Sequence, residues 1–347
     1  MKNLLLLGAG HAHAVLLHSL GEAPLYGARV TLVAPSRRQI YSGMLPGIVA
    51  GHYARGEAEI DISLLAQRAY AELVQGEVTG LDAERRSVTL ADGAKLAYDI
   101  ASFNVGSRID CSIPGSVEHA LPVKPFERLV ERLLPAASTA LVGAGAAGVE
   151  LAMAIRQRGG EATLYSDRLP FRGPLERRVL RALRRRGVNF IGLGVDAIEP
   201  GPVVLAGKSR AQYEQVILAT GAAPMPWLRE SALARDANGF VLVDETLRST
   251  SHPEVFATGD CASLRDAAHP KSGVYAVRHG ETLAASLRHL IASEPLERYR
   301  PQQKALMLLS CGGRYAIAER GAWTAEGHLV WRWKDWIDRR WIKSLET

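Results

Sequence analysis

The stretch LLLLGAGHAHAVLL, residues 4–17, decides the fold, because a short apolar run leads through a glycine turn into a pattern of good helix formers. A similar stretch, LVGAGAAGVELA, occupies residues 141–152. A second apolar strand follows each of them, over residues 28–33 and 162–165. A strand, a helix and a second parallel strand in this order form the βαβ unit of a doubly wound sheet. The sequence therefore predicts an α/β fold in which this unit occurs twice.

The glycines of both turns indicate nucleotide binding. The N-terminus of a helix offers unpaired backbone N–H groups and about half a positive charge, and a diphosphate reaches them only where the backbone comes close. The first glycine allows the tight turn, the second leaves room for the phosphates, and the third packs the helix on the strand. We therefore expect two Rossmann-like dinucleotide-binding domains. The residues concerned are Gly8 and Gly10 in the first copy, where His13 replaces the third glycine, and Gly143, Gly145 and Gly148 in the second.

Two histidines follow the first glycine turn. Residues two apart on a helix point to different sides, so His11 and His13 do not converge on one ion, and we expect no metal site. We interpret His13 as a packing residue within the cofactor site and His11 as a neighbour of the cofactor.

The end of the second strand of each unit predicts ribose contacts. Pro35 and Ser36 stand there in the first unit, which lacks the usual acid, so Ser36 takes its place. In the second unit Asp167 favours NADH, whereas Arg168 suits the 2′-phosphate of NADPH. The choice between the two nucleotides stays open at this stage.

The composition is that of a globular protein of two or three domains. The chain has 347 residues, of which 47% are hydrophobic and 22% are charged. Its cysteines are few and far apart, which is typical of a reducing compartment. The first apolar run is too short for a secretory signal, and no run approaches the ~20 residues of a membrane span. We expect a cytoplasmic protein, at most peripheral to the inner face of the membrane. The cysteines are Cys111, Cys261 and Cys311.

The net charge of +6 comes in part from an arginine-rich stretch at residues 177–186. Apolar residues recur within it at helical spacing, so we interpret it as an amphipathic helix with a solvated basic face. No aromatic side chains interleave with these arginines, and we expect no binding of nucleic acid.

Between the two units, residues 78–98 alternate apolar and polar side chains around Asp92 and Gly93, which predicts an antiparallel hairpin. Residues 217–221 and 255–260 each read as a strand that ends in a Thr-Gly pair, and a helix is expected over residues 273–291.

The order of these motifs resembles the two-dinucleotide flavoproteins of the pyridine nucleotide-disulfide oxidoreductase superfamily. VFATGD at residues 255–260 is similar to the family's second FAD signature, whose aspartate holds a ribityl hydroxyl of FAD, and that aspartate is Asp260 here. FNVGS at 103–107 and LATGAAP at 218–224 resemble the segments that cross between the domains. The resemblance implies FAD and either NADH or NADPH as cofactors. It adds Val78, Asn104, Val105, Gly106, Gly221 and Gly259 to the cofactor-binding candidates.

The resemblance also implies domain limits. Residues 1–118 and 245–292 form a discontinuous FAD-binding domain, and residues 119–244 form the NAD(P)H-binding domain. Residues 293–347 form a small C-terminal subdomain that holds five of the six tryptophans.

Within the superfamily, the chain resembles the NADH-dehydrogenase-like branch, and most of all the flavoprotein domain found ahead of selenide, water dikinase in some fusion proteins. The resemblance is carried by GAGHAH at residues 8–13, YSGMLPG at 41–47 and PKSGVYAVR at 270–278. The tryptophan-rich WRWKDWIDR at 331–339 is also similar.

The resemblance implies roles for several residues around the flavin. Met44 and Pro46 line the ring, and the helix that begins near Gly273 aims its first amides at the place where negative charge develops on reduction. Glu150 either faces the nicotinamide or caps its helix. The candidates for direct participation in the reaction are Ser272, Gly273, Val274 and Arg278.

The sequence predicts the electron acceptor less precisely than it predicts the cofactors. Residues 41–47 contain no cysteine pair, which argues strongly against a disulfide reductase. Quinone-reducing relatives carry paired glutamines where this chain has Val274 and Arg278. This departure weakens the quinone assignment without removing it, so a quinone stays one candidate among small acceptors. One alternative is a flavoprotein that oxidises sulfide or thiols through Cys111 or Cys311. Another is a nucleotide-sensing module without turnover.

The C-terminal residues predict an amphipathic helix. Trp333, Trp336, Ile337, Trp341 and Leu345 fall on one face of it, with basic residues around them. This face either lies in a membrane interface or packs on the protein or on a second subunit of an oligomer.

Overall fold

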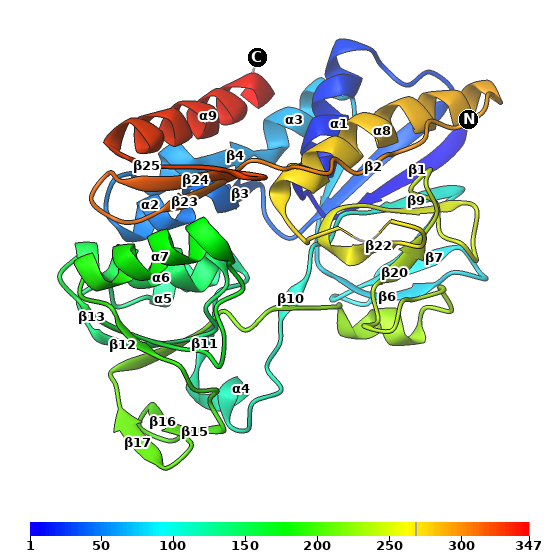
Figure 1. The fold of residues 1–347 in the computed structure, drawn as a ribbon. Coiled ribbons are helices and arrows are strands. Elements are labelled where there is room, and N and C mark those ends of the chain that lie inside the picture. The colour runs from blue at the N-terminus through cyan, green and yellow to red at the C-terminus, as the bar shows by residue number, and fades with distance from the viewer. Residues whose placement is uncertain (268, 347) are drawn as a thin grey trace.

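The computed structural model describes residues 1–267 and 269–346 and contains two parallel five-stranded sheets. The sheet order is β21–β9–β1–β2–β5 in the first and β11–β18–β12–β13–β14 in the second. This is the α/β fold with two Rossmann-type units that the sequence predicted (Figure 1). The strands of the first sheet are β1 Lys2–Leu7, β2 Ala28–Ala34, β5 Glu72–Gln75, β9 Ile100–Phe103 and β21 Val255–Ala257, and those of the second are β11 Leu121–Pro122, β12 Ser138–Val142, β13 Glu161–Tyr165, β14 Asn189–Ile191 and β18 Gln215–Leu218.

Helices cover both sheets, and their packing explains one further glycine. Helix α1 (His11–Glu22) follows β1 and crosses the long helix α8 (Gly273–Ala292). At the crossing Gly280 lies so close to Ala12 that a Cβ atom would be 2.6 Å from its carbonyl oxygen. The remaining helices are α2 Leu45–Val49, α3 Ile62–Arg68, α4 Ser116–His119, α5 Phe126–Arg132, α6 Ala146–Gln157, α7 Gly173–Arg185 and α9 His328–Glu346.

Short antiparallel segments complete the two units. The predicted hairpin is confirmed and gains a third strand, giving the order β6–β7–β8. The pair β10–β19 lies where the chain passes between the units, and β3–β4 flank the loop at residues 41–47. The bounds are β3 Arg38–Ile40, β4 Glu59–Asp61, β6 Val78–Asp82, β7 Ser87–Leu90, β8 Lys95–Ala97, β10 Arg108–Ile109, β15 Ala197–Glu199, β16 Val203–Ala206, β17 Ser209–Gln212, β19 Ala222–Ala223, β20 Val241–Val243 and β22 Ala262–Leu264.

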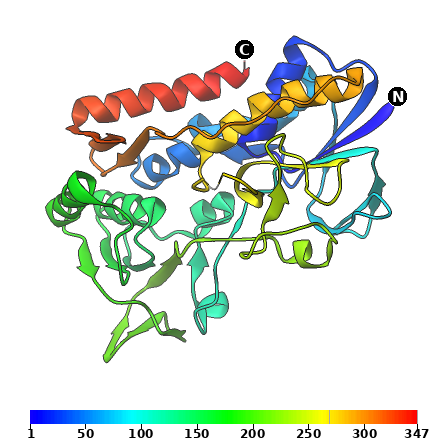
Figure 2. The same ribbon diagram turned by 45° about the vertical axis from the view of Figure 1, so that its right-hand side comes forward.

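The C-terminal residues form an antiparallel sheet, β23 (Met307–Ser310), β24 (Ala316–Arg320) and β25 (Trp323–Gly327), followed by α9. In Figures 1 and 2 these strands lie between α9 and the green helix α7. The C-terminal segment thus bridges the two Rossmann-type units.

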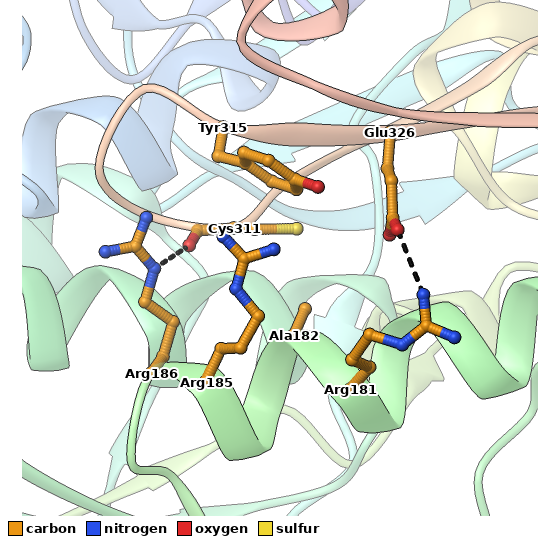
Figure 3. Close-up of a pocket in the computed structure, with 7 residues that line it drawn as sticks. All are labelled: Arg181, Ala182, Arg185, Arg186, Cys311, Tyr315 and Glu326. Atoms are coloured by element: carbon orange, nitrogen blue, oxygen red, sulfur yellow. Dashed lines mark hydrogen bonds and ion pairs between the residues drawn. The ribbon is translucent and has the colours of Figure 1, made fainter.

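The predicted basic face of α7 is not wholly solvated, and that part of the prediction is wrong. Figure 3 shows the helix turned towards the C-terminal strands. Arg186 donates to the carbonyl of Cys311 at 2.7 Å, and Arg178 and Arg181 pair with Glu326 at 2.8 and 3.3 Å. The arginines fasten the second unit to the C-terminal subdomain because two carbonyls and a carboxylate meet them there.

The predicted apolar face of α9 also needs correction. Trp341 and Leu345 pack against the protein, whereas Trp333 and Trp336 are 39% and 56% exposed. The buried face instead includes the charged residue Lys334. In the part of the chain that the structure describes, no helix is both long and apolar enough to cross a lipid bilayer.

Candidate functional site

The first glycine turn, between β1 and α1, is built against the end of strand β9. Gly8 has a φ of +85°, and a Cβ atom there would lie 2.6 Å from the carbonyl oxygen of Asn104. A Cβ atom at Gly10 would clash with the Asn104 side chain. Both positions require glycine because Asn104, which follows the neighbouring parallel strand β9, leaves no space.

Asn104 ties this turn together. Its Oδ1 accepts hydrogen bonds from the N–H groups of Ala12 and His13 at 3.1 and 3.2 Å, and its Nδ2 donates to Thr258 O at 2.9 Å. The side chain therefore satisfies two of the amides at the start of α1. The sequence proposed Asn104 as a cofactor contact, and the structure gives its side chain this capping role.

His13 occupies the position of the missing third glycine and is wholly buried. Its Nδ1 donates to Gly8 O at 2.6 Å, so Nε2 is the acceptor for the Ser102 hydroxyl at 2.8 Å. Burial lowers the pKa of His13 to about 4, which keeps the ring neutral. Both ring nitrogens of His13 therefore have protein partners, as expected of a packing residue. Only the backbone of His13 lies at the N-terminus of α1.

His11 joins three predicted parts of the flavin site. Its Nε2 lies 3.4 Å from Ser42 Oγ in the loop at residues 41–47, and a Cβ atom at Gly273 would be 3.3 Å from the same nitrogen. Burial lowers the pKa of His11 to about 4. The structure thus brings the start of α1, this loop and the start of α8 together.

The start of α8 presents free amides. Ser272 is the N-cap but makes no capping hydrogen bond through its side chain, and the N–H groups of Gly273 and Val274 have no partner among the described residues. Val274 is 43% exposed, and Arg278 pairs with Glu281 at 2.9 Å on the surface.

Within the loop, Met44 and Pro46 are both buried, and Met44 is fully enclosed. Met44 packs with Tyr53, Ala58 and Ile342 rather than lining an open face. Protein atoms therefore surround Met44, which supports the loop from behind, and its contact with the flavin ring stays a prediction.

Asp260 lies at the end of β21, and the structure reveals a partner that sequence reasoning missed. Lys124 Nζ donates to Asp260 Oδ2 at 2.7 Å and to Ser107 Oγ at 3.0 Å. Burial alone would raise the pKa of Asp260, but Lys124 and Ser107 outweigh it, and the pKa is lowered. A lone lysine 136 residues from its partner gives no local signal in the sequence.

The second glycine turn, between β12 and α6, is tighter and more open to solvent. Gly143 has a φ of +105°, and Cβ atoms at Gly143 and Gly148 would clash with the carbonyls of Ala219 and Gly143. A Cβ atom at Gly145 would meet nothing within 4 Å. No side chain caps α6, and its first amides have no partner in the described ranges.

Glu150 lies one turn into α6. Its Oε1 accepts a hydrogen bond from the N–H of Ser310 at 2.7 Å, so it holds the C-terminal sheet rather than capping its own helix. Burial, partly offset by the charge of Lys334, raises the pKa of Glu150 to about 7.

The predicted ribose-contacting residues lie at the ends of their strands. Ser36 Oγ accepts from the N–H of Arg38 at 3.3 Å, while Gln75 donates to Pro35 O at 3.3 Å. Asp167 and Arg168 are exposed after β13. The remaining predicted cofactor contacts lie in three places. Val78 is buried in β6, and Val105, Gly106 and Gly259 lie near Asn104 after the ends of their strands. Gly221 is exposed after β18 and has a φ of +141°.

Comparison with known proteins identifies the family. The model for "Pyridine nucleotide-disulphide oxidoreductase" matches residues 2–280. The chain belongs to this family. The family and its structural neighbours are FAD-binding, NAD(P)H-using oxidoreductases, which confirms the predicted cofactors.

Three similar proteins refine this assignment. An NADH dehydrogenase-like protein of Mycobacterium tuberculosis is 32% identical over 221 residues, which are 55% of each chain, so the chain spans about half of that relative. The NADH dehydrogenase-like protein YutJ of Bacillus subtilis is 24% identical over 91% of each chain. The sulfide:quinone oxidoreductase of Aquifex aeolicus superimposes with a TM-score of 0.79 at 15% identity, covering 100% of this chain and 92% of the other. The NADH-dehydrogenase-like branch is confirmed, while the likeness to the fused flavoprotein domain stays a prediction.

Proposed function

We propose that the chain holds one FAD and transfers hydride from NADH or NADPH to it, and then passes electrons to a small acceptor of the quinone class. Residues 1–118 and 245–292 would hold FAD and residues 119–244 the nicotinamide nucleotide, with residues 293–347 packed over both. The proposal is carried by one observation, the two glycine turns that approach helix amides at the edges of two parallel sheets.

The residues fit FAD at the first turn. Gly8 and Gly10 place no side chain in the turn at the start of α1, and Asp260 keeps one carboxylate oxygen without a partner among the described residues. That oxygen suits a ribityl hydroxyl. Because Lys124 lowers the pKa of Asp260, the carboxylate stays ionised and accepts such a hydrogen bond at neutral pH.

The chain's own groups would then support the reaction. FAD, when bound, supplies the centre that takes up hydride and releases electrons. The free amides of Gly273 and Val274, at the positive end of α8, stabilise negative charge placed before them. Glu150, with a pKa of about 7, holds or releases a proton at its carboxyl group near neutral pH.

The thiol-oxidising alternative is disfavoured by the state of the cysteines. Cys311 is buried, and burial raises the pKa of its thiol far above the usual range, so little thiolate is present. Cys111 is partly buried and lies against Ile109 O. Replacing Cys111 and Cys311 by alanine should leave electron transfer unchanged, whereas loss of sulfide oxidation would favour the alternative.

We also propose a peripheral contact with anionic membranes through the exposed face of α9. Leu329, Trp333 and Trp336 are exposed there, close to Arg332 and Arg340. Tryptophan beside basic residues suits a bilayer interface. In a flotation assay the chain should rise with phosphatidylserine vesicles, and a Trp333→Ala, Trp336→Ala double variant should remain in the dense fraction. Equal flotation of the variant would count against this face.

The central test is anaerobic incubation of the purified, FAD-loaded protein with NADH and with NADPH, followed by a screen of quinones and other acceptors. Rapid bleaching of the flavin supports the enzyme, and bound FAD that neither nucleotide reduces would favour the sensing module. Gly10→Val should prevent FAD retention, while Gly145→Val should retain FAD and slow bleaching. A Gly10→Val protein with stoichiometric FAD would overturn the first site.

A further inference from the structure

Helix α9 carries a buried ion pair whose place in the fold calls for an explanation. Lys334 and Asp338 stand one turn apart and are 6% and 4% exposed, with Nζ and Oδ2 2.6 Å apart. Burying two charges costs desolvation energy, and apolar side chains of similar size commonly pack at least as stably. The pair is therefore poorly explained by helix packing alone.

Both charges reach out of the helix to the loop at residues 41–47. Lys334 Nζ donates to Gly43 O at 2.6 Å, and the Tyr41 hydroxyl donates to Asp338 Oδ1 at 3.3 Å. Trp341, one turn further on, packs on Tyr41 with ring centroids 4.6 Å apart and on His11 at 5.1 Å. Helix α9 thus contacts the segment that precedes α2 through three of its side chains.

Lys334 also lies within electrostatic reach of the second unit. Its charge opposes the rise in the pKa of Glu150, while Asp338 adds to it. Glu150 is itself tied to the C-terminal sheet through the N–H of Ser310. The ammonium group of Lys334 accordingly contacts the loop of the first unit and acts electrostatically on Glu150 of α6 in the second.

We propose that Lys334 is a positioning residue of the flavin site: held by Asp338, its ammonium group fixes the Gly43 carbonyl, shapes the loop that receives the isoalloxazine ring, and places a positive charge beside it. The inference rests on the proposed function, since it takes this loop as part of the FAD site. A nearby positive charge favours the reduced, negatively charged flavin.

The test separates this role from a structural one through a paired substitution. Lys334→Met alone leaves a buried carboxylate without its partner, so it destabilises the fold for either reason. Lys334→Met with Asp338→Leu removes both charges while keeping the volume, and this double variant should remain folded. Arg339→Gln removes a positive charge from an exposed site on the same helix and serves as the control.

The readouts are the dissociation constant of FAD and the flavin reduction equilibrium against a dye of known potential. In the double variant FAD should bind at least tenfold more weakly, and reduction should be about tenfold less favourable, which is ~30 mV for two electrons. Arg339→Gln should match the wild type in both. A folded double variant with wild-type values in both would overturn the inference.

Failure of the proposed function gives a different result. If the wild-type chain takes up no FAD, or holds FAD that neither nucleotide reduces, the enzyme assignment itself fails. If the wild type behaves as proposed and only the double variant is unaltered, the role of Lys334 fails alone.

Discussion

The two glycine turns have the same backbone and different surroundings. Gly10 and Gly145 are both N-caps with nearly identical dihedral angles, φ −61° and ψ 178° against φ −63° and ψ 179°. At α1, protein groups fill the turn, since Asn104 takes two amides and His13 binds the first glycine's carbonyl. At α6, no atom lies within 4 Å of a Cβ atom built at Gly145, and the first amides have no partner among residues 1–267 and 269–346.

The third position shows how one backbone motif accepts two side chains. At α6 the helix lies so close that a Cβ atom at Gly148 would clash with the Gly143 carbonyl. At α1 the imidazole of His13 fills the corresponding gap and donates to Gly8 O at 2.6 Å. A braced turn suits a cofactor that stays, and an open turn suits a nucleotide that enters and leaves in each cycle.

The largest effect is expected from making the first turn resemble the second with His13→Gly. The change leaves Gly8 O and Ser102 without partners, opens a cavity and places glycine within a helix, so unfolding should become easier by about 4 kcal/mol. Urea denaturation of the FAD-free protein measures this. A loss below about 1 kcal/mol would mean that α1 simply closes up as α6 does.

The next effect comes from filling the second turn. Gly148→Ala should cost about 2–3 kcal/mol, because backbone must move away from the new methyl group. Gly145→Ala is the matched control, and it should change stability by less than about 1 kcal/mol yet weaken NADH and NADPH binding at least ~10-fold. Titration of nucleotide quenching and thermal unfolding distinguish the two. Wild-type nucleotide affinity in Gly145→Ala would remove this turn from the site.

Sequence reasoning succeeded where the signal is local. Two apolar strands with glycine turns, at residues 4–17 and 141–152, predicted both sheets and the helices after them. The helix predicted over residues 273–291 is observed as α8, Gly273–Ala292, so its end differs by one residue.

Sequence reasoning failed where partners are distant. The Lys124–Asp260 pair and the Lys334–Gly43 contact join residues 136 and 291 positions apart, and no periodicity encodes them. The face of α9 was misjudged for a related reason. A helix whose buried side carries Lys334 and Asp338 violates the apolar pattern on which the prediction relied.

A third, smaller effect concerns Glu150, because the corresponding place in the first unit is the apolar residue Val15. Its pKa is raised from 4.5 to about 7, so the folded state holds a proton that the unfolded state has lost. The stability that this proton contributes is complete below pH ~4.5 and is lost as pH rises through 7. Glu150→Gln should therefore be more stable than wild type above pH 7, by about 2 kcal/mol.

The measurement is the free energy of unfolding from pH 5 to 8 for both proteins. Their difference should grow with pH and level off above 7. A difference that is constant across this range would show that the pKa of Glu150 is not raised by its surroundings.

The smallest effect is expected from substitutions at the predicted ribose-contacting residues, which follow the second strand of each unit. Asp167 and Arg168 are exposed, so their contribution to nucleotide choice is limited by solvent screening. Asp167→Ala should weaken NADH by about 3–10-fold and spare NADPH, while Arg168→Ala should do the reverse if the 2′-phosphate is bound there. Ser36→Ala in the first unit is the control, since it should leave both reduction rates unchanged while loosening FAD slightly. The substitution that has no effect on affinity identifies the nucleotide that the second unit does not select. If neither substitution changes the affinity for either nucleotide, the selectivity lies in the backbone after β13 rather than in these side chains.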